Sequence, residues 1–413
     1  MKRLRVLMLS PIWPWPGTTG GLVRIAGIAK GLAEQMDVTL VAPSGLDPDQ
    51  HALRLATEAG IRVVLVRTPD KALARLRGLI SLRPYHAELY ASRAVAETVA
   101  NELQASGYDL VYCHFLYSLQ YVPNDADVPV VLDQQNVDTV YWGRKAGHAH
   151  GVRRLVSTWN LWRVRRYELE QLRRVWAYVS VSELDRDLTQ TYAAGQVKEF
   201  FVAPNGVDTA SFAPASGQRD SKSEGLRLAF VGSLDMDFNT SAAQRLCTDL
   251  LPRLRQALPD RRVCVTLIGR NPPRALRRLA ELDDSIEVTG TVPDVRPWLQ
   301  RADVFVAPLG FGAGTKLKVV EAMASGVPVV GTDIALEGLS GIDGVHYLRA
   351  NEDADIVAAI CGLARSASLR RRVAAAGREL AVATASWSTV TRQLACDLEA
   401  ALLRAHGRSI GHG

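Results

Sequence analysis

The segment GAGTKLKVVEAMASGVPVV brings together residue types that suit a bound phosphate and a sugar. Gly312 and Gly314 allow a tight backbone turn, and Thr315 has the side chain of an N-cap for a helix whose first turn holds Lys316. The unpaired N–H groups and the positive dipole at a helix start favour phosphate. Glu321 only accepts hydrogen bonds when it is ionised, and two sugar hydroxyls would satisfy it. An ordinary α/β connection with a solvated glutamate has the same pattern.

Other candidate residues follow predicted strands in the first half of the chain. The pair Gly20 and Gly21 comes after the first strand and opens a helix, which suits a phosphate or a closely approaching sugar. His114 ends the strand of VYCHFLY, and Asn136 follows the strand that begins VVLDQQNVD. The carboxyl ends of parallel strands share one edge of the sheet, so these residues are expected to face a cleft. Turn glycines and a structural histidine are the alternative interpretations.

The second half of the chain offers a possible phosphate clamp and a carboxylate pair. Arg270 follows the strand VCVTLIG, again at the binding edge. Asp235 and Asp237 form a DxD pair, which can hold Mg²⁺ against a diphosphate. They lie directly after a strand and Gly232, where carboxylates also form turns and cap helices. We favour the cap and expect no metal site and no cofactor.

These residues are carried by two series of alternating strands and helices. Apolar strands separated by helical stretches fill residues 1–203 and begin again at residue 226, as in parallel sheets with helices on both faces. Residues 204–225 are rich in Pro, Gly, Ser and Asp and predict an interdomain linker. The sequence therefore predicts an α/β protein of two doubly wound, Rossmann-like domains, with a ligand site at the cleft between them.

Bulk composition is typical of a globular protein with more than one core. Of 413 residues, 47% are hydrophobic and 22% are charged, and no run approaches the roughly 18 apolar residues of a membrane helix. The cysteines are scattered and odd in number, which favours reduced side chains and a cytoplasmic location. They are Cys113, Cys247, Cys264, Cys361 and Cys396.

One segment is strongly basic. Between Tyr141 and Val175 the chain has nine lysines and arginines against Glu168 and Glu170, with three tryptophans interleaved. The basic residues are Arg144, Lys145, Arg153, Arg154, Arg163, Arg165, Arg166, Arg173 and Arg174. A solvated helix face explains such a run, and contact with an anionic membrane surface explains it nearly as well. No nucleic-acid recognition motif accompanies the charge, so we expect no nucleic-acid partner.

Taken together, the motifs resemble the family 4 glycosyltransferases with the GT-B fold. The resemblance covers essentially the whole chain, and the order and spacing of its motifs are more specific than any one of them. The matching segments are TTGGLVR, VAPNGVD, FVGSLD, VTGTVPDV, GAGTKLKVVEAMASGVPVVGT and the final SWSTVTRQL.

The resemblance implies a fold and an activity. Residues 1–203 would bind the acceptor, residues 226–385 would bind the nucleotide sugar, and residues 386–413 would form a helix that crosses back onto the first domain. The implied reaction is sugar transfer from a UDP- or GDP-sugar to an acceptor hydroxyl with retention of configuration and without a metal. The expected acceptors are glycans and lipid-linked molecules of cell-surface assembly, which makes the protein cytoplasmic or peripheral at the inner face of the membrane.

The resemblance also implies site residues. His114 would hydrogen-bond the donor sugar, Glu321 would hold the ribose hydroxyls, and the helix start at Lys316 would receive the diphosphate. The implied donor side comprises Gly232, Arg270, Val292, Gly314, Thr315, Lys316 and Glu321. The implied acceptor and sugar side comprises Gly20, Gly21, Arg24 and Asn136.

Two motifs depart from the family pattern. The first of two carboxylates common around the loop before Glu321 is Ala313 here, as in a subgroup of bacterial transferases. The Arg and Lys that often follow the first strand of the second domain are missing from GSLDMDFNTSAAQR, so Lys316 or Arg270 would supply that charge. Three alternatives remain open: glycosylation of a small natural product, another nucleotide-sugar enzyme such as an epimerase or phosphorylase, and a non-catalytic binding subunit.

Overall fold

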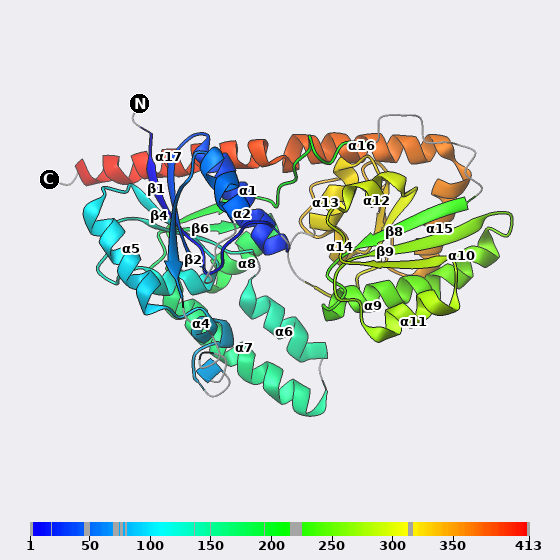
Figure 1. Cartoon of the computed structure of the whole chain (residues 1–413), viewed down its shortest axis with the longest axis horizontal. Helices are drawn as coiled ribbons and strands as arrows, with labels where there is room; N and C mark the ends of the chain where they lie inside the picture. Colours follow the sequence, from blue (N-terminus) through cyan, green and yellow to red (C-terminus); the bar gives the residue numbers. More distant parts are fainter. Residues whose placement is uncertain are drawn as a thin grey trace. The chain divides into compact units, whose positions relative to one another are not determined.

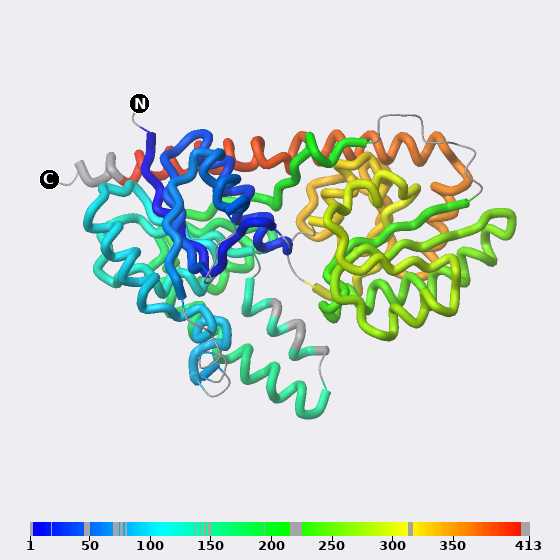
Figure 2. Tube along the Cα trace, in the orientation of Figure 1, coloured from blue at the N-terminus to red at the C-terminus, as the bar shows by residue number. Residues whose placement is uncertain are grey.

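The computed structural model contains two compact units (Figure 1). Unit 1 comprises Met1–Pro204 and Trp387–Gly413, and unit 2 comprises Asn205–Ser386. Figure 2 traces in colour the residues that the structure describes. These are all residues except 1–2, 18, 45–49, 69–73, 75–76, 79–80, 136, 149, 194, 215–224, 313–316 and 411–413.

Unit 1 is built on a seven-stranded parallel sheet in the order β3-β2-β1-β4-β5-β6-β7. The strands are β1 (Arg5–Leu9), β2 (Asp37–Ser44), β3 (Arg62–Arg67), β4 (Leu110–His114), β5 (Val130–Asp133), β6 (Ala177–Ser180) and β7 (Glu199–Val202). The helices are α1 (Gly20–Ala33), α2 (Gln50–Glu58), α4 (Tyr85–Leu89), α5 (Arg93–Ala105), the 3₁₀ helix η1 (Leu116–Tyr121), α6 (Asp138–His148), α7 (Gly151–Leu172), α8 (Glu183–Ala193) and α17 (Trp387–Ile410).

The strand order of unit 1 follows from its buried apolar strands. All five residues of β4 are buried, and β1 is buried from Val6 onward, because helices cover both faces of a parallel sheet. The chain begins in the middle at β1, moves outward to β3, and then returns to place β4 on the other side of β1. Val6 accordingly pairs with Val38 of β2 and with Leu110 of β4. The reversal makes the β1/β4 boundary a topological switch point.

Unit 2 repeats this plan on a six-stranded parallel sheet in the order β10-β9-β8-β11-β12-β13. The strands are β8 (Gly225–Val231), β9 (Arg262–Ile268), β10 (Ile286–Gly290), β11 (Val304–Ala307), β12 (Val329–Gly331) and β13 (Leu348–Arg349). The helices are α9 (Asp237–Arg245), the π-helical turn η2 (Leu246–Leu250), α10 (Leu251–Ala257), α11 (Arg274–Leu282), α12 (Arg296–Arg301), α13 (Leu317–Ala324), α14 (Asp333–Leu336), α15 (Asp353–Arg365) and α16 (Ala367–Ala385).

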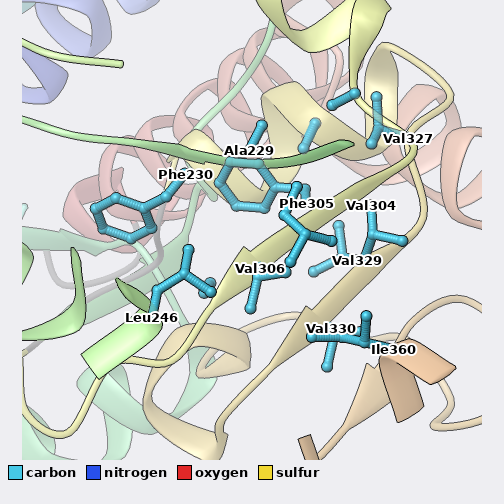
Figure 3. Packing of buried hydrophobic residues seen from close by; sticks show 14 of the residues in the cluster. Ala229, Phe230, Leu246, Val304, Phe305, Val306, Val327, Val329, Val330 and Ile360 are labelled. Carbon is cyan, nitrogen blue, oxygen red and sulfur yellow. The ribbon is translucent and has the colours of Figure 1, made fainter. Parts of the chain in front are cut away.

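The core of unit 2 is packed around its central strands. Figure 3 shows side chains of β8, β11 and β12 in contact with Leu246 of η2 and Ile360 of α15. Phe305 and Val330 are fully buried, and each such side chain contributes about 1.5–3 kcal/mol by leaving water. The reversal of strand order lies between β8 and β11, which makes this boundary the switch point of unit 2.

The C-terminal helix α17 packs on α1 within unit 1. Two glycines of α1 make this contact close. A Cβ atom on Gly27 would lie 2.3 Å from the Trp387 ring, and one on Gly31 would lie 2.1 Å from the Thr391 hydroxyl. The small residues on this face of α1 therefore allow α17 to pack closely against it.

The predicted fold class is confirmed. Each unit is a doubly wound, Rossmann-like domain, and the closing helix belongs to the first of them. Within the described residues, we find no helix whose length and hydropathy would let it span a membrane.

Candidate functional site

The candidate residues gather at the switch points of the two sheets. In unit 1 they follow β1, β4 and β5, and in unit 2 all but Val292, which follows the edge strand β10, come after β8, β9 and β11. The carboxyl ends of parallel strands at such a point leave a crevice in which doubly wound domains bind ligands. Each unit thus has one edge where a ligand is expected.

In unit 1 the start of α1 lies against the ends of β4 and β5. Gly20 is exposed at the first position of α1. A Cβ atom on Gly21 would lie 3.1 Å from both the Phe115 ring and Gln135 Oε1, and Gln135 Nε2 donates to the Gly21 carbonyl over 3.0 Å. Phe115 has φ +62°, so the chain turns sharply after His114. The structure therefore brings the glycine pair and His114 to the same edge.

His114 belongs to a fully buried polar cluster. Its Nδ1 lies 3.1 Å from Asp133 Oδ2. Asp133 also accepts from Arg24, with 2.7 Å between Nη2 and Oδ1 and 3.0 Å between Nε and Oδ1. All three side chains have no exposed surface. His114 Nε2 has no hydrogen-bond partner among the described residues.

Burial and charge set the protonation of this cluster. Burial alone would raise the pKa of Asp133, but Arg24 and His114 outweigh it and bring the pKa to about 2. Burial lowers the pKa of His114, and the opposing effect of Asp133 is smaller. The cluster at neutral pH therefore holds an ionised carboxylate, a guanidinium and a neutral imidazole.

Two acceptor-side predictions need comment. Arg24 does not reach a surface where it would touch a sugar, because its guanidinium donates inward to Asp133 and to the carbonyls of Ala203 and Pro204. Arg24 acts as a brace that links α1 to β5 and to the residues that follow β7. Asn136 lies outside the described residues.

In unit 2 the ends of β8 and β9 approach so closely that only glycine fits. A Cβ atom on Gly269 would lie 1.7 Å from the Gly232 carbonyl oxygen, and one on Gly232 would lie 2.8 Å from the Asn239 side chain. Arg270 Nε donates to Ser233 Oγ over 3.1 Å, and Leu234 N donates to the Arg270 carbonyl. Arg270 therefore lies at the predicted edge, tied to the loop that follows β8.

The carboxylate pair after β8 has ordinary structural partners. Asp235 accepts from Asn271 Nδ2 over 3.1 Å. The N-cap of α9 is Met236, and Asp237 occupies the first turn without a side-chain capping bond. The predicted cap is thus wrong in detail, because the aspartate stabilises the helix through the dipole instead. No group of three or more His, Cys, Asp or Glu suited to a metal occurs in the described part of the chain.

Helix α13 carries the acidic candidate and a lysine. Desolvation raises the pKa of Glu321 to about 7, although part of its side chain reaches solvent, and the positive charge of Lys318 opposes the rise. Lys318 Nζ donates to Asn239 Oδ1 and lies 4.6 Å from the centre of the Phe230 ring and 5.7 Å from that of Phe238. The lysine thus reaches from α13 across to the β8–α9 segment.

The flanks of α13 complete this region. Gly326 has φ +66° and follows the end of the helix, a position that favours glycine. Val292 is half-buried in the loop after the edge strand β10, packed on the core of unit 2. Gly314, Thr315 and Lys316 lie outside the described residues.

Lys318 is the residue that sequence reasoning missed. The family's basic pair is expected after β8, and the sequence there offers none. Lys318 places a cation beside Phe238 and Asn239, in the same segment, from a helix about 80 residues further on. The spacing between Lys318 and Glu321 could have identified the lysine, because residues three apart in a helix share one face.

The comparisons with known proteins agree with this architecture. Residues 18–211 match the family model described as "Glycosyltransferase Family 4", and residues 225–366 match the one described as "Glycosyl transferases group 1". The two matches together span most of the chain and correspond to the two sheets.

Curated relatives are also glycosyltransferases by name. A phosphatidyl-myo-inositol mannosyltransferase of Mycobacterium leprae is 30% identical over 221 residues, which are 52% of this chain and 57% of that protein. A D-inositol 3-phosphate glycosyltransferase of Pseudarthrobacter chlorophenolicus is 32% identical over 152 residues, 34% of each chain. The chain spans about half the length of the curated relatives it matches.

Among solved structures, Anabaena HepE in complex with UDP superposes with a TM-score of 0.66 at 17% identity, over 97% of this chain and 100% of that one. Sucrose-phosphate synthase from Thermosynechococcus elongatus gives a TM-score of 0.69 at 16% identity, over 98% and 100%. At these identities the likeness shows the fold alone. The two sheets, the two family matches and these neighbours together mean that the chain belongs to the family 4 glycosyltransferases with the GT-B fold.

Proposed function

We propose that this protein transfers a sugar from a nucleotide-diphosphate donor to an acceptor hydroxyl, with retention of anomeric configuration. The observation that carries the proposal is the pairing of Glu321 with Lys318 on α13, beside the β8/β11 switch point of unit 2. An acceptor-only carboxylate and a cation one helical turn apart match the ribose hydroxyls and the diphosphate of one ligand.

The donor is assigned to unit 2. Glu321 accepts hydrogen bonds from the ribose hydroxyls, and the residues that precede α13 in the sequence, Gly314, Thr315 and Lys316, receive the diphosphate. Lys318 and Arg270 replace the missing basic pair of the β8 loop. Gly232 keeps that loop close enough for its backbone to approach the ligand.

Charge stabilisation is the main catalytic device in this proposal. The nucleoside diphosphate gains negative charge as the glycosidic bond breaks, and cations already aimed at that position lower the barrier without reorganising. The acceptor attacks from the face that the diphosphate leaves, and a phosphate oxygen takes the hydroxyl proton. No protein nucleophile and no metal is required, so EDTA is expected to leave the turnover rate unchanged.

The acceptor and the transferred sugar are assigned to unit 1. Exposed Gly20 leaves room for a sugar at the start of α1, Gly21 lets the helix start lie close against Phe115 and Gln135, and neutral His114 offers Nε2 as its hydrogen-bonding atom. His114 is closed off from solvent, so a sugar that reaches it must displace the residues that cover it. The relative named as a phosphatidyl-myo-inositol mannosyltransferase supports a lipid-linked acceptor, and the one named as a D-inositol 3-phosphate glycosyltransferase supports a small phosphorylated acceptor.

The first test is a thermal-shift panel of UDP, GDP and their sugars, since a ligand that binds only the folded state raises the melting temperature with its affinity and concentration. We expect one nucleotide class to stabilise the protein, and Glu321→Ala to remove that shift. Leu279→Ala, on α11 of the same unit, is the matched control and should retain it. A protein that no nucleotide stabilises would contradict the donor assignment.

The second test is product analysis with the preferred donor. Release of free nucleotide that depends on an added acceptor supports transfer, and the anomeric configuration of the product tests retention. Conversion of the donor in the absence of an acceptor indicates an epimerase. Binding without turnover indicates a non-catalytic subunit, and turnover on small aglycones alone indicates a natural-product enzyme.

A further inference from the structure

Helices α6 and α7 form a hairpin at one side of unit 1 (Figure 1). Helix α6 ends at His148, and α7 begins at Gly151 and runs for 22 residues. Its C-terminal half packs on the unit through Val164, Tyr167 and Leu172, which are buried. Its N-terminal half is exposed at almost every position. The hairpin therefore presents a long stretch of helix surface that the described core does not cover.

That surface is apolar along one line. Val152, Leu155, Val156, Trp159 and Trp162 are between 46% and 75% exposed. At 100° per residue these five side chains fall within an arc of about 120° on the helix. The two tryptophan rings stack with 5.1 Å between their centroids. A monomeric protein rarely leaves such a contiguous apolar stripe in water, so it marks an interaction surface.

Arginines border the apolar line. Arg166 falls within the same arc, and its guanidinium carbon lies 5.8 Å from the centre of the Trp162 ring. Arg153 and Arg165 are exposed about 60° beyond the two edges of this arc, whereas Arg154 lies on the far side of the helix, about 140° from the centre of the arc. We use the name basic-aromatic face for the five apolar residues together with Arg153, Arg165 and Arg166. Tryptophan and arginine beside exposed aliphatic side chains are the composition of helices that lie in a membrane interface.

Buried polar contacts hold the C-terminal half of α7 in place. Arg163 is buried and donates through Nε to the Arg83 carbonyl over 3.0 Å and through Nη2 to the Gly78 carbonyl over 2.9 Å. Glu168 is also buried and accepts from Thr139 Oγ1 of α6 over 2.5 Å. These bonds fix the rotation of α7, so the basic-aromatic face is displayed in one orientation. Arg163 itself is not part of the surface, despite its place in the basic run of the sequence.

We propose that the basic-aromatic face docks unit 1 on an anionic lipid membrane. The charge of the face favours a membrane over a second copy of the chain. A second copy would bring arginines close to arginines, whereas anionic phospholipid headgroups pair with them. Nucleic acid would pair with the arginines as well, but it offers no partner for Val152 and Leu155, which acyl chains solvate. The inference does not depend on sugar transfer and its test requires no activity.

The test is co-flotation of the full chain with vesicles. Equal parts phosphatidylglycerol and phosphatidylcholine are compared with pure phosphatidylcholine. We expect binding to the anionic vesicles that weakens at 0.5 M salt, since screening shortens the reach of the charges. Arg165→Gln with Arg166→Gln should weaken binding by about 25-fold, at about fivefold for each arginine near the surface.

The apolar contribution is tested separately. Leu155→Gln, Trp159→Gln and Trp162→Gln together should abolish flotation, whereas Leu184→Gln with Leu403→Gln should retain it. The control removes two exposed leucines of α8 and α17 in the same unit, 45% and 62% exposed. Unchanged melting temperatures of all variants establish that folding is not the cause.

Three results would overturn the proposal. The first is wild-type protein that fails to float with anionic vesicles. The second is a loss of binding in the control variant equal to that in the triple variant. The third is sedimentation of the wild type as a dimer that the triple variant dissociates, since the face would then be an interface between copies.

Discussion

The proton affinity of Glu321 gives a direct test of the ribose contact. The pKa of this carboxyl is raised to about 7 by desolvation in the unliganded protein. Ribose hydroxyls donate hydrogen bonds to the ionised form, so a bound nucleotide sugar must favour ionised Glu321. Binding should therefore release a proton below pH 7 and strengthen as the pH rises through 7.

The size of the effect follows from the fraction of ionised Glu321. With a pKa of about 7, about a tenth of the carboxyls are ionised at pH 6 and about nine tenths at pH 8. If the ligand binds only the ionised form, its dissociation constant should be about tenfold lower at pH 8 than at pH 6, which is about 1.4 kcal/mol. A Glu321 with an unperturbed pKa would give no change in this range.

Isothermal titration of the preferred nucleotide sugar at pH 6, 7 and 8 measures this dependence. A nucleotide sugar is used because its diphosphate is esterified at both ends and does not itself titrate between these values. Glu321→Gln keeps the size of the side chain and removes the titrating group, so its weaker binding should be independent of pH. An equal pH dependence in wild type and Glu321→Gln would refute the assignment.

Three further predictions concern the described contacts. Lys318→Met should weaken donor binding by about 10- to 100-fold, the loss of one charge-assisted contact, and Lys318→Arg should restore part of it in the same titration. Asp133→Asn leaves the Arg24 guanidinium buried without a counter-charge and should lower the free energy of unfolding in urea by about 3–5 kcal/mol. The control Asp37→Asn removes an exposed ion pair and should change this free energy by less than about 1 kcal/mol. Because the folded pKa of Asp133 is depressed to about 2, the stability from this pair should be present above about pH 4 and lost as the pH falls towards 2. Gly31→Ala forces a Cβ atom into α17 and should lower the free energy of unfolding by about 1–3 kcal/mol. The control Gly143→Ala, whose Cβ would have no atom within 4 Å, should be neutral or stabilising. Equal melting temperatures of the two variants would contradict the close contact between α1 and α17.

Much of the fold was predictable from local pattern. Buried parallel strands are nearly continuous apolar runs, so β4, β9 and β11 stand out between helical stretches without any tertiary information. Gly326 follows a short helical stretch and precedes Pro328 by two residues, which is a usual place for a glycine that ends a helix, and its φ is positive. Such features depend on a few neighbouring residues, which the sequence contains.

The candidate site was predictable only as far as chain order allows. His114, Gly21 and Arg270 were predicted at strand ends, and strand ends of a parallel sheet share an edge whatever the side-chain details. Whether a side chain at that edge turns outward or inward depends on partners far away in the sequence. Arg24 shows this, because the carboxylate that draws it inward is Asp133, 109 residues further along the chain.

The sequence by itself determined the alternation of strands and helices, the two doubly wound units and the segments that hold the candidate residues, because periodicity and turn chemistry are local properties. The tertiary structure alone decided that Arg24 is a buried brace, that Lys318 reaches Asn239, and that the pKa of Glu321 is high. Each of these depends on desolvation and on charges brought close by folding, and electrostatic energies are set by distances in space, not along the chain.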